Sequence, residues 1–97
     1  KNFYMHNTGH WLGLDVHDPL DYVDIKGSTR LKAGMIFTVE PGLYIKSDKS
    51  IPKQFHNIGI RIEDDILVTK KGPVVLTCKA PKTISDIERQ MKAYVKE

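Results

Sequence analysis

Three histidines and two aspartates fall within thirteen residues near the start of the chain, in the stretch HNTGHWLGLDVHD from residue 6 to residue 18. Imidazole and carboxylate groups at this density can bind a divalent cation or move protons. His10 and His17 bracket the apolar stretch WLGLDV, which would be roughly 20 Å long as a strand. The two rings can therefore share one site only if this segment bends, and Gly9 and Gly13 permit such a bend.

Glu40 is a second candidate, because it is predicted to end a strand. The stretch GMIFTVE, residues 34–40, is rich in β-branched and aromatic residues and alternates in character. The alternation places Ile36, Thr38 and Glu40 on one face, and Met35, Phe37 and Val39 on the other. A turn is predicted over residues 41–43, since Pro41 cannot donate to a strand ladder and Gly42 tolerates positive φ. The polar residues 46–57 are predicted to form an exposed loop.

Glu63 is a third candidate, on a strand predicted over residues 58–69. Its alternation places Ile58, Ile60 and Ile62 on one face, and Gly59, Arg61 and Glu63 on the other. A buried carboxylate needs a cationic partner, so Glu40 and Glu63 would pair either with Arg61 or with a metal. Glu63 could also form an ordinary salt bridge with a lysine or arginine elsewhere, and the spacing alone leaves these readings open. One imidazole with carboxylates suits manganese, iron, cobalt or zinc, and bridging carboxylates suit a two-metal hydrolytic site.

The remaining pattern predicts supporting structure. Asp64 and Asp65 are interpreted as structural, with Asp64 on the apolar side of the strand and Asp65 at its exposed end. A turn at Lys71 and Gly72 precedes a short strand predicted over residues 73–77. A helix is predicted from Thr83, which would act as N-cap with Asp86 three residues on. Its apolar stripe, interpreted as core packing, comprises Ile84, Ile87, Met91, Tyr94 and Val95.

Composition indicates an ordinary soluble domain with one modest core. The chain has 97 residues, 40% hydrophobic and 28% charged, and its net charge of +3 is spread out, which argues against a nucleic-acid or membrane surface. The single cysteine, Cys78, is predicted to be a buried structural thiol and suits a reducing compartment. No membrane-helix or signal-peptide pattern is present. Because the first motif begins five residues after Lys1, the chain is expected to be cut from a longer one.

Three motifs in order, HNTGHWLGLDVHD, GMIFTVEPGLYI and GIGIRIEDDILVT, resemble the catalytic domain of bacterial-type aminopeptidase P, or Xaa-Pro aminopeptidase. This family is one of the pita-bread metallopeptidases, with prolidase and methionine aminopeptidase. Residues 1–97 would then be the C-terminal half of the catalytic domain, an α+β fold of antiparallel strands with a C-terminal helix. Its first half and a separate N-terminal domain would lie outside this chain. Asn7 departs from the family, which most often has glycine there.

The resemblance also implies site residues and cofactors. The family holds two divalent ions, usually Mn²⁺, with two aspartates, one histidine and two glutamates. His10 matches the histidine ligand, Glu40 the carboxylate ligand near the attacking water, and Glu63 the bridging carboxylate. The catalytic surroundings would include His17 at the scissile carbonyl, His6 near the proline pocket, Arg61 beside the second glutamate, and Tyr44 on the pocket wall. The two aspartates are not matched within this chain, so it would carry three of five ligands and be inactive alone.

The implied function is hydrolysis of the bond between the N-terminal residue and a proline in second position of a peptide. The full-length protein from which this chain comes would be cytoplasmic and homo-oligomeric, with no nucleic-acid or membrane partner. Two alternatives stay open. One is a prolidase restricted to Xaa-Pro dipeptides, and the other is a non-catalytic pita-bread module that binds a peptide or protein.

Overall fold

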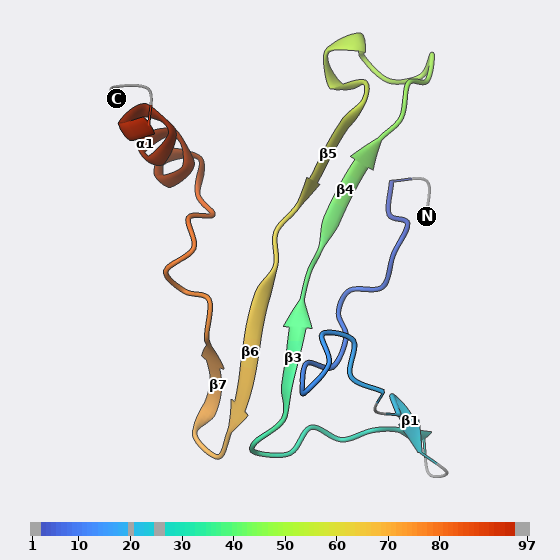
Figure 1. The fold of residues 1–97 in the computed structure, drawn as a ribbon. Coiled ribbons are helices and arrows are strands. Elements are labelled where there is room, and N and C mark those ends of the chain that lie inside the picture. Colours follow the sequence, from blue (N-terminus) through green and yellow to red (C-terminus); the bar gives the residue numbers. More distant parts are fainter. Residues whose placement is uncertain (1–2, 20, 25–26, 95–97) are drawn as a thin grey trace.

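The computed structural model describes residues 3–19, 21–24 and 27–94. Short strands, one turn of 3-10 helix and a C-terminal helix follow one another along the chain (Figure 1). In order they are β1 (Val23–Asp24), β2 (Gly27–Ser28), β3 (Ile36–Val39), β4 (Gly42–Ile45), the 3-10 helix η1 (Lys53–Phe55), β5 (Ile58–Arg61), β6 (Asp64–Thr69), β7 (Gly72–Val75) and α1 (Ile84–Tyr94).

One long antiparallel hairpin dominates the arrangement. β3 pairs with β6 and β4 pairs with β5, so that Thr38 lies opposite Asp65 and Gly42 lies opposite Arg61. Both ladders therefore keep a single register, and Figure 1 shows β3 running on into β4 beside β5 running on into β6. Between the ladders, the Ile62 N–H donates to the carbonyl of Pro41 at 3.1 Å.

This hairpin corrects two predictions. The turn expected over residues 41–43 is wrong, because Gly42 and Leu43 begin β4. Pro41 does lack a ladder donor, but its fixed φ suits extended backbone, so it interrupts the pairing without reversing the chain. The strand expected over residues 58–69 is divided into β5 and β6 at the same level, beside Pro41. The loop over residues 46–57 is confirmed, with η1 inside it.

Residues 8–12 pair with the other edge of β3. The N–H groups of Thr38 and Glu40 donate to the carbonyls of His10 and Thr8 at 2.9 and 2.8 Å, and Leu12 N–H donates to Ile36 at 3.1 Å. Beyond Leu12 the chain turns back, and Asp18 N–H donates to the Trp11 carbonyl at 3.2 Å. WLGLDV is therefore not an extended strand throughout, and the bent alternative is the observed one.

In the C-terminal part the start of the helix is predicted correctly and the end of the preceding strand is not. Gly72, with φ of 123°, follows the turn that leads into β7, which ends at Val75 and not at residue 77 as expected. The helix begins where predicted, because the Thr83 hydroxyl accepts from Asp86 N–H at 3.1 Å and donates to the Asp86 carboxylate at 2.7 Å. Figure 1 shows α1 set apart from the hairpin at the end of an irregular segment.

Burial within the described chain is slight. Trp11 is its one buried hydrophobic residue, and the Cα radius of gyration is 17.6 Å, against roughly 13 Å for a compact domain of this length. Two burial predictions are wrong: Cys78 is exposed, and so are Ile84, Ile87, Met91 and Tyr94 of the helical stripe. Ile84 and Ile87 of the stripe line an open hollow with Ile60 and Ile62, and the fifth member, Val95, lies outside the described residues. Among the described residues, no helix has the length and apolar character to cross a membrane.

Candidate metal centre

The structure brings together the three residues predicted as metal ligands. His10 comes from the segment that pairs with β3, Glu40 directly follows β3, and Glu63 directly precedes β6. One donor atom from each lies within 4.8 Å of the others. The paired segment, the end of β3 and the start of β6 thus bring one nitrogen and two carboxylate oxygens close together.

Glu40 is the buried member of this group, with 6% of its surface exposed. One oxygen, Oε1, accepts a hydrogen bond from Thr38 Oγ1 at 2.8 Å and lies 3.3 Å from His10 Nε2. The other, Oε2, lies 3.3 Å from Nη1 of Arg61. A buried carboxylate requires such partners. Of the two cationic partners considered from the sequence, Arg61 does contact Glu40.

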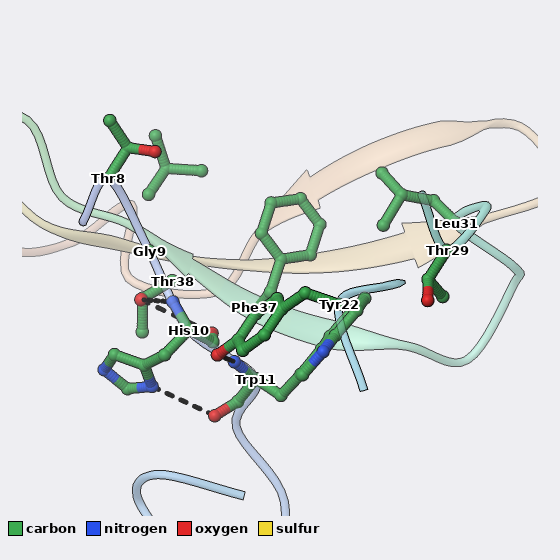
Figure 2. Close-up of a pocket in the computed structure, with 10 residues that line it drawn as sticks. Thr8, Gly9, His10, Trp11, Tyr22, Thr29, Leu31, Phe37 and Thr38 are labelled. Carbon is green, nitrogen blue, oxygen red and sulfur yellow. Dashed lines mark hydrogen bonds between the residues drawn. The ribbon is translucent and has the colours of Figure 1, made fainter. Parts of the chain in front are cut away.

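The hydrogen bonding of His10 makes its second nitrogen available as a ligand. Nδ1 lies 3.0 Å from the Trp11 carbonyl, which can only accept, so Nδ1 carries a proton and donates (Figure 2). In the neutral ring Nε2 then bears a lone pair, and it faces the carboxylate oxygen of Glu40. Two electron pairs at this distance call for a cation between them, either a proton or a metal ion.

Several features favour the metal ion. The backbone carbonyl on the far ring nitrogen is the usual arrangement for a metal-binding histidine. Glu40 and Glu63 place two carboxylates at one point, where a divalent cation would neutralise both. The donor set therefore fits a hard or borderline divalent cation.

The bend after Leu12 brings His17 to the same site. The rings of His10 and His17 meet edge to face with centroids 4.4 Å apart, so the bend that Gly13 permits does join the two histidines. A Cβ at Gly9 would overlap the Thr38 carbonyl, which shows how closely this segment approaches β3. A hollow of about 260 Å³ is lined by His6, Asn7, Gly9, His10, His17, Tyr22, Glu40 and Arg61.

Tyr44 joins the remaining predicted residues. His6 Nδ1 donates to the Asn7 carbonyl at 2.7 Å, so its Nε2 accepts from the Tyr44 hydroxyl at 2.8 Å. The same phenol oxygen accepts from Arg61 Nε at 2.8 Å, and this bond raises the pKa of Arg61 above its usual value. A Cβ at Gly42 would lie 2.7 Å from the Tyr44 ring and 2.8 Å from His6 Nε2, so a larger residue there would displace these two side chains.

A second, more apolar hollow of about 300 Å³ is lined by His10, Trp11, Tyr22 and Phe37, among others (Figure 2). The Trp11 ring is stacked on Tyr22 with ring centroids 5.8 Å apart, and its centroid lies 6.0 Å from that of Phe37 in an edge-to-face arrangement. The Tyr22 hydroxyl also accepts from Trp11 N–H at 3.2 Å. These contacts hold Trp11, the residue directly after His10, in place.

The aspartates next to Glu63 lie outside the site, as predicted. Asp64 pairs with Lys82 at 2.8 Å and accepts from the Thr77 hydroxyl at 2.6 Å, and the bond from Lys82, more than that from Thr77, lowers the pKa of Asp64. Asp64 therefore faces polar partners and not an apolar side, and Asp65 lies half-buried inside β6 and not at an exposed end. Both expectations of their surroundings are wrong. His56 also lies elsewhere, bonded to Ser47 and Ile51 within its own loop.

The sequence predicts only the strand face of Thr38, and not its contact with the site. Thr38 was predicted to share a face with Glu40, and its hydroxyl now proves to contact both Glu40 and His10. Its position two residues before a candidate ligand on the same face was the available signal.

Known proteins resemble this chain in sequence and in fold. Residues 1–70 match the model of metallopeptidase family M24. The chain is 52% identical over 91 residues to a Xaa-Pro aminopeptidase of Haemophilus influenzae, covering 94% of this chain and 21% of the relative. Among solved structures, aminopeptidase PepP of Pseudomonas aeruginosa superimposes with a TM-score of 0.90 at 49% identity, over 98% of this chain and 22% of that one. Aminopeptidase P of Escherichia coli with the inhibitor Pro-Leu gives 0.87 at 49% identity, over 98% and 21%. The chain thus spans about a fifth of the length of the relatives it matches.

Proposed function

The chain belongs to metallopeptidase family M24, and on that premise we propose that it supplies part of the active site of a Xaa-Pro aminopeptidase. Residues 1–97 are then the C-terminal half of a pita-bread catalytic domain. The observation that carries the proposal is the convergence of His10, Glu40 and Glu63 within 4.8 Å. The substrate is a peptide with proline in second position, and the bond before that proline is hydrolysed.

The cofactor in this proposal is a pair of Mn²⁺ ions. His10, Glu40 and Glu63 would hold them together with two aspartates that the family supplies from outside this chain. Such ions polarise a carbonyl and make a water molecule more acidic near neutral pH. The chain alone would then be inactive, since it brings three of five ligands.

The chain's own side chains have distinct parts in this reaction. Glu40 takes up the proton of the attacking water on its carboxylate, which Thr38 and Arg61 hold by one oxygen each. His17, beside His10, donates a hydrogen bond to the scissile carbonyl as negative charge develops there. His6, held by Tyr44, lines the space for the proline ring, and Arg61 keeps Glu40 in place.

The proposal is tested with the full-length protein that contains this chain. Loaded with Mn²⁺, it should release the first residue of a tripeptide with proline second, and His10→Ala should lose both bound metal and activity. Cleavage of an Xaa-Pro dipeptide with no action on the tripeptide would indicate prolidase. A full-length protein that binds no metal and cleaves neither peptide would indicate a binding module. A cytoplasmic location and a homo-oligomeric parent are further parts of the proposal that rest on the resemblance alone.

A further inference from the structure

Thr38 is the least exposed residue among those whose burial the structure describes, with 3% of its surface accessible. A hydroxyl in such a place must find partners, because an unpaired buried polar group is costly. Its two closest partners are both parts of the candidate metal centre. They are the backbone N–H of His10, at 2.9 Å, and Oε1 of Glu40, at 2.8 Å (Figure 2 shows the first).

The direction of these two bonds is fixed by chemistry. The His10 N–H can only donate, so Oγ1 of Thr38 accepts it. The single hydroxyl proton is then left for Glu40, since its other acceptor, the His10 carbonyl, is farther away at 3.5 Å. The two hydrogen bonds therefore run in one direction: the His10 N–H donates to Thr38 Oγ1, and the Thr38 hydroxyl donates to the carboxylate of Glu40.

The sheet explains why the threonine can reach both ligands. Thr38 lies opposite His10, whose carbonyl also accepts the Thr38 backbone N–H at 2.9 Å. Glu40, two residues further, has its side chain on the same face. The β-branched threonine has restricted χ1 freedom in a strand, which helps to hold its hydroxyl in this direction.

We propose that Thr38 is a positioning residue of the metal centre, whose hydroxyl sets the orientation of the Glu40 carboxylate relative to His10. With Thr38 on Oε1 and Arg61 on Oε2, each oxygen of Glu40 has its own donor, and rotation of the carboxylate would break one of the two bonds. Thr38 acts through Glu40 and His10 and does not itself bind the metal. This inference rests on the proposed function, because it concerns the same site.

The test compares variants of the full-length protein in their affinity for Mn²⁺, measured by calorimetry well below the unfolding temperature of each metal-free protein. Thr38→Val keeps the branched shape and removes the hydroxyl, and it should weaken Mn²⁺ binding about 10- to 100-fold, as loss of an outer-shell partner does. Thr38→Ser keeps the hydroxyl and should stay near the parent protein. At saturating Mn²⁺, Thr38→Val should lower kcat with KM little changed, since Glu40 and not the peptide-binding surface is misplaced.

A purely structural role predicts something else. The metal-free Thr38→Val protein would unfold at a lower temperature, while the folded fraction bound Mn²⁺ as tightly as the parent. That result, or equal weakening in Thr38→Val and Thr38→Ser, would overturn the inference. If Thr38→Val does not fold, Thr38→Ala replaces it in the comparison with Thr38→Ser, because these two differ only in the hydroxyl.

The outcomes also separate this inference from the proposed function. A parent protein that binds Mn²⁺ and cleaves Xaa-Pro peptides, with Thr38→Val binding Mn²⁺ equally well, removes the inference alone. A parent that binds Mn²⁺ and cleaves no such peptide removes the proposed activity, while the affinities still decide the part played by Thr38. A parent that binds no Mn²⁺ removes both.

Discussion

Glu40 and Glu63 face one another across a single antiparallel hairpin, each with a carboxylate oxygen within 4.8 Å of the other. The shared register of the two ladders, with Thr38 opposite Asp65 and Gly42 opposite Arg61, places these glutamates at the interruption between them. Like charges directly opposite one another destabilise a sheet. The arrangement is therefore favourable only with cations present. Arg61 forms an ion pair with Glu40 and not with Glu63.

Neutralising Glu63 should separate the metal-free and metal-bound stabilities. Glu63→Gln should slightly raise the unfolding temperature of the metal-free protein, because it relieves a repulsion of about 0.2–1 kcal/mol. It should also lose most of the stabilisation that Mn²⁺ gives the parent, since a ligand is missing. Thermal unfolding with Mn²⁺ and with a chelator measures both effects. Glu88→Gln, an exposed carboxylate on α1, is the charge-matched control, and equal stabilisation of both variants by Mn²⁺ would count against Glu63 as a ligand.

Gly9 should be needed for the position of His10. Gly9→Ala would drive a Cβ into the Thr38 carbonyl, so residues 8–12 must move away from β3 and carry His10 with them. We expect a lower unfolding temperature together with weaker Mn²⁺ binding. Gly27→Ala is the control, because its φ of 118° makes alanine unfavourable while no atom lies within 4 Å of the added Cβ. It should destabilise the protein and leave Mn²⁺ affinity unchanged, whereas normal affinity in Gly9→Ala would contradict the argument.

The local pattern predicted what local forces decide. Alternation placed Thr38 and Glu40 on one face of β3, and the capping pair Thr83 and Asp86 marked the start of α1, because both depend on residues a few positions apart. The pattern did not predict that the chain continues straight through Pro41. That outcome depends on β5 pairing with β4 from some fifteen residues away, and no periodicity shows it.

Burial was predicted least well. The exposed Ile84 and Met91 have the spacing of a core stripe, yet burial needs an opposing surface, and spacing carries no information about one. The site shows the same division between local and distant information. Residue type and the family resemblance named His10, Glu40 and Glu63, whereas the bonds of Thr38 with His10 and of Tyr44 with Arg61 became visible only with the pairing of distant segments.

The N-cap of α1 should stabilise that helix measurably. Thr83→Ala removes the hydroxyl that accepts from Asp86 N–H, and should cost about 1 kcal/mol of helix stability. Thr83→Ser keeps the cap and serves as control. Amide hydrogen exchange of the first turn of α1 should be faster in Thr83→Ala alone, and equal rates in the two variants would show that the cap contributes nothing.

The ion pair of Asp64 with Lys82 should make stability depend on pH in the acid range. Bonds from Lys82 and Thr77 lower the pKa of Asp64 from its usual 3.8, so the folded state favours the charged carboxylate. This stabilisation is present above pH 3.8 and is lost as pH falls through the lower folded value. Asp64→Asn should therefore be less stable than the parent at pH 7, and the difference should shrink in acid. Denaturant unfolding at pH 7 and in acid measures this difference in stability. A difference that stays constant with pH would refute the stabilising role of the Asp64 carboxylate.

The Tyr44 hydroxyl should matter to catalysis because it holds His6 and Arg61 at once. Tyr44→Phe keeps the ring and removes the oxygen that lies 2.8 Å from each of these residues. Arg61 is then free to leave Glu40, and the loss of its hydrogen bond to the phenol should lower kcat/KM roughly tenfold in the Mn²⁺-loaded full-length protein. Tyr94→Phe, on the exposed face of α1, should leave kcat/KM unchanged. A fall that appears equally in Tyr94→Phe, or none in Tyr44→Phe, would mean that Arg61 holds Glu40 without help from the phenol.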